Sequence, residues 1–197
     1  VANCNFDNNT ANRSGGAIFW YGRNGTIHAS NFTNNRALGK VLYNDSYDKP
    51  TYGGNGGAIM WTGFNGHVDN CDFDDNYAEN HGGAVYLQGN SAYGNCENTT
   101  FEDCTFENNI AHNNGGAIDW HKGARNGIVD NCTFINNTAD ANGGAINWNG
   151  MNGTVKNSRF TNNRATGTNW KYTLELDMGT NIVVGADAFH CSIRRET

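Results

Sequence analysis

Residues 131–148 read Asn-Cys-Thr-Phe-Ile-Asn-Asn-Thr-Ala-Asp-Ala-Asn-Gly-Gly-Ala-Ile-Asn-Trp, and this stretch contains two blocks that recur along the chain. The first block, Cys/Ser-x-Phe-x-Asn/Asp-Asn-x-Ala, begins at Cys4, Ser30, Cys71, Cys104, Cys132 and Ser158. The second block, Gly-Gly-Ala-Ile/Val-x-Trp/Leu, begins at Gly15, Gly56, Gly82, Gly115 and Gly143. A third, apolar position recurs at Ile27, Val68, Phe101, Val129 and Val155.

The first block returns every 26 to 28 residues except at two places. The extra residues lie between Ala37 and Gly56 and between Leu87 and Phe101. Stacked repeats tolerate insertions that are confined to turns. We therefore predict a repeat region over residues 1–166, with insertions at 38–55 and 88–98. Residues 167–197 depart from the pattern but alternate like strands, which predicts a degenerate last coil or a cap.

Within each block, apolar and variable residues alternate. Ile18 and Trp20 share one side, for example, and the residue between them differs in every copy. This is the pattern of a strand with one buried face. The Asn-Asn, Gly-Gly and Asn-Gly corners accept left-handed backbone angles. One coil cannot bury its apolar side alone, so we predict an all-β, right-handed parallel β-helix of about six coils with three short strands per coil. A leucine-rich-repeat horseshoe is less consistent with the sequence, because the repeat contains neither a leucine ladder nor a helical stretch.

Stacked coils place like residues above like. The expected structural ladder comprises a cysteine column interchangeable with serine, a phenylalanine column and a tryptophan column: Cys4, Cys71, Cys104, Cys132; Phe6, Phe32, Phe73, Phe106, Phe134, Phe160; Trp20, Trp61, Trp120, Trp148. An asparagine ladder is expected at the corner, where stacked amides hydrogen-bond along the column. The invariant alanines of the Gly-Gly-Ala block fall on the outward face by alternation. Either a neighbour packs closely there or the strand bends.

The composition is that of a folded domain with a thin core. Only 37% of the residues are hydrophobic and mean hydropathy is −0.67, but 12% are aromatic and the net charge is only −6. The mild acidity and the lack of a basic stripe argue against nucleic-acid binding. No apolar run approaches the ~18 residues of a membrane span. Because the chain starts inside a repeat, we expect it to begin within a longer protein, and a missing signal peptide therefore says nothing about export.

The pairing of Phe-x-x-Asn with Gly-Gly-Ala-Ile/Val resembles the repeats of chlamydial polymorphic outer-membrane proteins. The first motif occurs at Phe6/Asn9, Phe32/Asn35, Phe106/Asn109 and Phe134/Asn137. The longer form, from Asn131 through Ile146, is similar to adhesin-like surface proteins of methanogenic archaea. The resemblance extends over residues 1 to about 166, and it implies a β-helical passenger, secretion and adhesion. It implies no catalytic residue.

The cysteines and acidic residues offer few candidate sites. Exchange with serine fits a small, buried, reduced thiol, and in-register Cβ vectors seldom allow a disulfide. Cys96 and Cys191 lie off the ladder and have no assigned role. No metal site is expected, apart from weak Ca²⁺ candidates where acids stack: Asp69, Glu102, Asp130, Asp74 and Glu107. The alternative for these acids is a solvated acidic face. No cofactor is expected.

The outward aromatic residues are the main candidates for binding. Phe19, Met60 and Tyr86 should stack on the outward face of three successive coils, close to Tyr43, Tyr47 and Tyr52 of the first insertion. An exposed apolar strip of this kind would suit sugar stacking. The alternative is that the insertion folds down and covers the strip. One compact group mixes acidic and basic side chains and would be the candidate for catalysis. It comprises Asp119, His121, Lys122 and Arg125, but it occurs once and no motif supports a catalytic role.

These observations favour a non-enzymatic extracellular or cell-surface β-helix, an adhesin-like stalk or passenger that attaches to glycans or proteins of a neighbouring cell. A polysaccharide lyase or glycoside hydrolase of β-helix fold is one alternative. A self-assembling sheath or fibre unit, joined end to end, is another.

Overall fold

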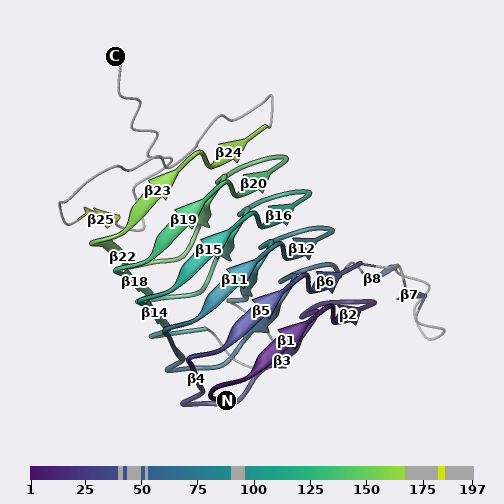
Figure 1. Cartoon of the computed structure of the whole chain (residues 1–197), viewed down its shortest axis with the longest axis horizontal. Coiled ribbons are helices and arrows are strands. Elements are labelled where there is room, and N and C mark those ends of the chain that lie inside the picture. Colours follow the sequence, from purple (N-terminus) through teal and green to yellow (C-terminus); the bar gives the residue numbers. More distant parts are fainter. Residues whose placement is uncertain (40–41, 44–49, 52, 90–95, 167–181, 185–197) are drawn as a thin grey trace.

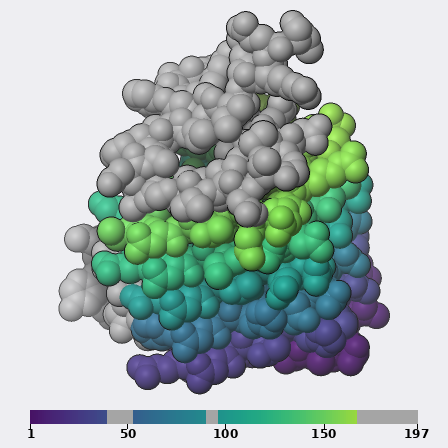
Figure 2. Space-filling model, turned by 90° about the vertical axis from the view of Figure 1, so that its left-hand side faces the viewer, coloured from purple at the N-terminus to yellow at the C-terminus, as the bar shows by residue number. Residues whose placement is uncertain are grey.

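The chain folds into a stack of short-stranded coils (Figure 1). The computed structural model describes residues 1–39, 42–43, 50–51, 53–89, 96–166 and 182–184. Four sheets run along the stack, and neighbouring strands in each sheet come from successive coils. In the space-filling view the sequence colours follow one another in layers along the stack (Figure 2). The predicted all-β parallel solenoid is confirmed.

Two of the four sheets have six parallel strands. The strands of the first, the Phe sheet, are β1 (Asn5–Asp7), β5 (Asn31–Thr33), β11 (Asp72–Asp74), β15 (Thr105–Glu107), β19 (Thr133–Ile135) and β23 (Arg159–Thr161). The strands of the second, the Ala sheet, are β2 (Thr10–Ala11), β6 (Arg36–Ala37), β12 (Tyr77–Ala78), β16 (Ile110–Ala111), β20 (Thr138–Ala139) and β24 (Arg164–Ala165).

The other two sheets complete each coil. The strands of the Trp sheet are β3 (Ile18–Trp20), β9 (Ile59–Trp61), β13 (Val85–Leu87), β17 (Ile118–Trp120) and β21 (Ile146–Trp148). The strands of the Val sheet are β4 (Thr26–His28), β10 (His67–Asp69), β14 (Thr100–Glu102), β18 (Ile128–Asp130), β22 (Gly153–Lys156) and β25 (Ile182–Val184). Each complete coil therefore has four strands, where the sequence predicted three. The Ala-sheet strands were missed because two residues are too few to show an alternation.

Both predicted insertions lie at corners between strands. The first falls between β6 and β9 and contains an antiparallel pair, β7 (Leu42–Tyr43) and β8 (Pro50–Thr51). The second falls between β13 and β14. Of the predicted last coil or cap, the structure describes only β25, which pairs antiparallel with β22. An antiparallel strand departs from the parallel stacking of the coils, but it covers an edge that would otherwise be open.

The predicted phenylalanine and tryptophan columns are confirmed. Neighbouring rings from Phe6 to Phe160 stack with centroids 4.7 to 4.8 Å apart and planes within 5°. This separation matches the ~4.8 Å spacing of strands, so the ring stack follows directly from the register. Trp20 stacks on Trp61 at 5.1 Å and Trp120 on Trp148 at 4.2 Å, and Leu87 fills the rung between the two pairs.

The alanines of the Gly-Gly-Ala block point into the core because the strand bends there. Ala58, Ala84, Ala117 and Ala145 are completely buried. At the first of these, the carbonyl of Ala58 accepts hydrogen bonds from two consecutive amides, Ala17 at 2.9 Å and Ile18 at 3.0 Å. The same pattern repeats at the next three coils. Two adjacent donors on one acceptor form a bulge, so strict alternation fails and both Ala and Ile face inward.

The corner asparagines form the predicted ladder inside the fold. Asn35, Asn76, Asn109 and Asn137 are fully buried, and each side-chain amide donates to the Oδ1 atom of the next coil at 2.8 to 3.0 Å. The same amides donate to a phenylalanine carbonyl of the preceding coil at 2.9 Å. The residue before each ladder asparagine has a φ of 54° to 56°, an angle that Asn and Asp tolerate better than most side chains.

Candidate functional site

The outward face of the Trp sheet carries the column predicted as an exposed aromatic strip. Phe19, Met60 and Tyr86 are in register on β3, β9 and β13, as expected. The prediction of exposure is wrong for two of them. Phe19 is 50% exposed, but Met60 and Tyr86 are only 5% and 4% exposed because other residues pack over this face. Tyr47 and Tyr52 lie outside the described residues, as does the side chain of Tyr43, so their predicted role stays a prediction.

The same column continues into a buried carboxylate. Asp119, the register partner of Tyr86 on β17, is 1% exposed. Its Oδ2 atom lies 2.9 Å from Nδ1 of His81, which comes from the corner of the preceding coil. The amide of Asn147 donates to Oδ1 at 3.1 Å. One carboxylate oxygen therefore accepts from an amide and the other contacts an imidazole nitrogen, so both have a polar partner, as buried polar atoms usually do.

Aromatic rings flank this carboxylate. The imidazole of His81 stacks on Tyr86 at 5.7 Å, and Tyr86 contacts His121 at 5.6 Å. Burial, and then the charge of Asp119, raise the pKa of Tyr86 above its ordinary value, so its hydroxyl stays protonated. An imidazole fixed by a carboxylate through Nδ1 can exchange a proton through its other nitrogen, which is an arrangement of general acid–base sites.

The partners of Asp119 come from outside the mixed group that the sequence places around it. His121 Nδ1 lies 3.0 Å from the carbonyl of its neighbour Lys122. Arg125 forms backbone bridges between coils, and its side chain is exposed. The actual partner, His81, was missed because it is 38 positions from Asp119 in the sequence. Alignment of the repeats places His81 level with Asn114 of the next coil and not with Asp119, so the repeat pattern carried no signal for this pair.

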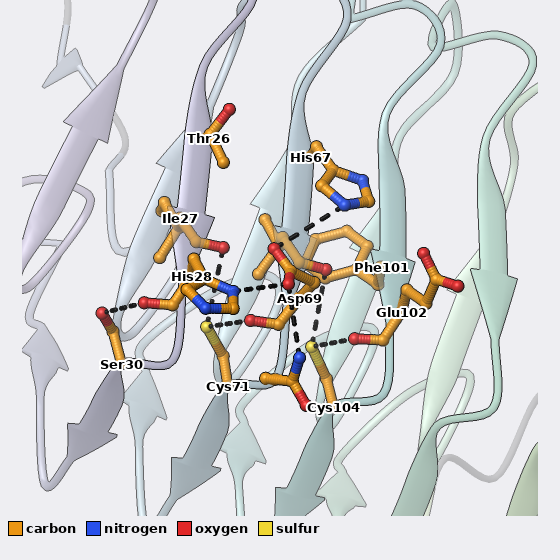
Figure 3. A network of polar contacts seen from close by, with 12 residues as sticks. Thr26, Ile27, His28, Ser30, His67, Asp69, Cys71, Phe101, Glu102 and Cys104 are labelled. Atoms are coloured by element: carbon orange, nitrogen blue, oxygen red, sulfur yellow. Dashed lines mark hydrogen bonds and ion pairs between the residues drawn. The ribbon is translucent and has the colours of Figure 1, made fainter. Parts of the chain in front are cut away.

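The outward face of the Val sheet carries a column of three acids with a basic residue at each end. Its register runs His28, Asp69, Glu102, Asp130, Lys156. Figure 3 shows Asp69 between two imidazoles, with His28 Nδ1 2.5 Å from Oδ2 and His67 Nε2 3.6 Å from Oδ1. At the other end, Lys156 Nζ lies 2.7 Å from Asp130 Oδ2. That hydrogen bond holds the pKa of Asp130 below its ordinary value.

This arrangement gives the stacked acids partners other than a metal ion. Asp69 contacts an imidazole and Asp130 contacts a lysine ammonium, and the second contact relieves the repulsion of like charges on adjacent rungs. On the Phe sheet, Asp74 and Glu107 are register partners as predicted, and Asp74 accepts a hydrogen bond from Asn108 at 3.1 Å. Among the described residues, no group of three or more His, Cys, Asp or Glu side chains has a geometry that could hold a metal ion.

The cysteine column is reduced, and three of its four thiols are buried. Cys71, Cys104 and Cys132 are free thiols, at most 2% exposed. Each Sγ lies 3.1 to 3.2 Å from the carbonyl two residues earlier, and the hydroxyls of Ser30 and Ser158 donate to the equivalent carbonyls at 2.8 and 2.9 Å. This shared acceptor explains why serine replaces cysteine.

The off-ladder thiol of Cys96 is also free and buried, and burial raises its pKa to about 12. The hydrogen bond with the Cys104 thiol, together with burial, raises the pKa of Cys71. Thiols with raised pKa values are poor nucleophiles, so these cysteines have a packing role. Cys191 lies outside the described residues.

With four sheets of stacked parallel strands around one core, and one antiparallel strand at the end of the Val sheet, the molecule has the architecture of a β-helix, and comparison with known families gives the same class. A family model described as the right handed beta helix region matches residues 56–194, and the chain belongs to this family. A second model, the Chlamydia polymorphic membrane protein repeat, matches residues 3–19. The predicted handedness and the resemblance to the chlamydial repeat are both confirmed.

The repeat match indicates a surface or autotransporter-like protein. No curated protein and no solved structure matches the chain. The described residues include no helix with the length and apolar character needed to cross a bilayer. The resemblance to archaeal adhesin-like proteins stays a prediction.

Proposed function

We propose that this chain is part of a non-enzymatic, adhesin-like surface protein that mediates attachment and needs no cofactor. The contrast between its interior and its exterior supports this proposal most directly. The inward positions of the Trp sheet repeat nearly unchanged, whereas the outward column reads Phe19, Met60, Tyr86, Asp119, Asn147. A constant interior maintains a rigid scaffold, and a varied exterior is free to acquire contacts with partners.

The proposed partners are glycans or proteins on the surface of a neighbouring cell. Exposed aromatic rings support a glycan, because the apolar face of a sugar stacks on them. Phe19 and Tyr21 are 50% and 65% exposed, and their rings lie edge to face at 6.5 Å. Phe19 lies in β3, the first strand of the Trp sheet, and Tyr21 is the residue that follows this strand. We therefore place the first contact with a glycan at these two rings.

A glycan array probed with the purified chain tests this function. We expect binding to a subset of glycans, and a loss of affinity of at least about tenfold in F19A or Y21A, equivalent to about 1.4 kcal/mol. The matched control is I110A, because Ile110 is 41% exposed and lies on the Ala sheet. Its affinity should equal that of the parent chain.

Two other outcomes would replace the proposal. Release of new reducing or unsaturated sugar ends from the bound glycans would identify a hydrolase or a lyase, and the His81–Asp119 pair would be the first place to look. Concentration-dependent filaments in the electron microscope, without glycan or cell binding, would identify a self-assembling sheath unit.

Attachment of chain-coated beads to cells, abolished by F19A, would support the adhesive role.

A further inference from the structure

The tryptophan column contains donors that the protein leaves without acceptors. The indole N–H of Trp20 donates to the carbonyl of Gly22 at 3.2 Å. The indole nitrogens of Trp61, Trp120 and Trp148 are buried and have no hydrogen-bond partner among the residues that the structure describes. Trp61 and Trp120 are completely buried as whole residues. Buried donors in folded proteins are paired with protein atoms or with ordered water.

The orphan nitrogens face the corner that joins the Trp sheet to the Val sheet. A Cβ placed on Gly63 would lie 3.4 Å from Nε1 of Trp61, and a Cβ on Gly150 would lie 3.4 Å from Nε1 of Trp120. The same two positions are 1.9 Å from the carbonyl oxygen of Gly22 and 2.8 Å from that of Ala124. Backbone acceptors therefore border the indole edges without forming direct hydrogen bonds with them. A buried donor at the same corner as an acceptor to which it does not donate directly is where a bridging water is expected.

The occupant common to these corners should be neutral. The corner after Trp61 contains Thr62, Gly63, Phe64, Asn65 and Gly66, without a charged residue. The corner after Trp120 contains Lys122 and Arg125. Because both nitrogens lack an acceptor in such different electrostatic surroundings, a halide or another anion does not account for both. We propose that one ordered internal water binds each of the indole N–H groups of Trp61 and Trp120 and bridges it to a backbone carbonyl of the corner.

Water-to-indole magnetisation transfer tests this site. In protein labelled with ¹⁵N-tryptophan, the indole protons of Trp61 and Trp120 should show direct cross-peaks to the water resonance, with the relative sign of water that stays bound longer than molecular tumbling. Single Trp→Phe variants assign the signals. Trp20, which has its own acceptor, should show at most the sign of short-lived surface water. Absence of long-lived cross-peaks at Trp61 and Trp120 would overturn the proposal.

A second measurement does not depend on spectral assignment. Trp120→Phe removes the N–H and keeps an aromatic ring. If a water is bound there, the number of long-lived internal waters, measured by magnetic relaxation dispersion of water oxygen-17, should fall by one. Trp20→Phe, the matched control, should leave that number unchanged. An equal number in parent and Trp120→Phe proteins would contradict the site, provided that circular dichroism shows both to be folded.

Discussion

At the scale of single residues, the most consequential polar contacts are those of the buried asparagine ladder. The amide of Asn109 donates to the carbonyl of Phe73 and to Oδ1 of Asn137, both at 2.9 Å. Its Oδ1 atom accepts from the backbone and the side chain of Asn76 at 3.1 and 3.0 Å. One side chain thus satisfies groups from the preceding and the following coils.

Replacing Asn109 with alanine should be strongly destabilising. The substitution leaves two donors on Asn76 and the carbonyl of Phe73 without this partner, and each buried orphan costs about 1–3 kcal/mol. We expect a loss of at least about 3 kcal/mol in the free energy of unfolding, measured by urea denaturation. The control is Asn126→Gly, because the exposed amide of Asn126 also donates to a neighbouring coil, to Oδ1 of Asn98 at 3.1 Å, and glycine keeps its φ of 54°. A similar loss in both variants would contradict the ladder's role.

In most coils a glycine leads into the Val-sheet strand, because the tryptophan side chain of the same coil leaves no room for a larger residue there. A Cβ on Gly127 would lie 1.9 Å from Cζ2 of Trp120, and a Cβ on Gly153 would lie 1.9 Å from Cζ2 of Trp148. In the coil where Leu87 replaces tryptophan, Thr99 replaces this glycine. The smaller side chain on the Trp sheet leaves room for a larger one at the corner.

A double-mutant cycle tests this exchange of volume. Gly127→Thr alone should destabilise the fold severely, and Trp120→Leu alone should leave a cavity. The double variant Trp120→Leu/Gly127→Thr should be more stable than the sum of the two losses predicts, by at least about 1 kcal/mol. Additive losses in thermal denaturation would show that the two positions do not compensate.

At the scale of the elements, each outward face of a sheet is a row of register partners. The acidic column of the Val sheet ends in His28 at one end and Lys156 at the other, and at the second end a lysine ammonium contacts the carboxylate of Asp130. Lys156 is the first cause of the lowered pKa of Asp130. A carboxyl group with a lowered pKa binds its proton less readily in the folded state than in the unfolded state. The stability that this group contributes is therefore lost as the pH falls.

Lys156→Met should therefore reduce stability at neutral pH but not in acid. The contribution of Asp130 is fully present above the carboxyl pKa of the unfolded chain, about 3.9, and is lost as pH falls through the lower pKa of the folded state. Because the pair is partly solvated, we expect less than about 1 kcal/mol. The difference in free energy of unfolding between parent and variant should shrink below pH 4. Lys122→Met, at an exposed lysine, serves as the control and should show no such pH dependence.

The strands that could be predicted from the sequence are those with three residues and a clear alternation. The two-residue Ala-sheet strands were missed because Ala37 or Ala111 alone gives no period. Alternation predicted the alanines of the Gly-Gly-Ala block on the outward face. They face inward because the strand bulges at Ala58 and at the equivalent alanines. On the outward face, register placed Met60 and Tyr86 correctly, but their burial depends on residues that pack over the sheet. Such contacts leave no periodic signal in the sequence.

At the scale of the whole molecule, the fold is a one-dimensional stack in which each coil rests on its neighbours. The repeat was sufficient to predict the architecture, because every coil uses the same inward residues and the same corners. It was insufficient to predict the His81–Asp119 pair, which arises between unlike positions of two coils. Features that occur once are invisible to an argument from repetition, and function in repeat proteins often depends on such features.

Thiol labelling measures how tightly the stack is closed. Cys71, Cys104 and Cys132 are at most 2% exposed, whereas Cys4 is partly exposed on the first coil. We expect Cys4 to react with a maleimide within the native state and the three buried thiols to react only as the chain unfolds. Mass spectrometry of the labelled peptides gives the four rates. Native-state labelling of Cys104 as fast as that of Cys4 would contradict a closed core.

The in-register stacking of coils is tested most directly by ring-to-ring contacts in solution. In protein with selectively labelled phenylalanine, nuclear Overhauser effects should connect Phe6, Phe32, Phe73, Phe106, Phe134 and Phe160 in that order, as a linear chain of neighbours one strand spacing apart. The contact between Phe32 and Phe73 is the strictest test of the register, because the first insertion lies between these two residues in the sequence. Contacts that skip this order, or an absence of contacts between these rings, would contradict the β-helix.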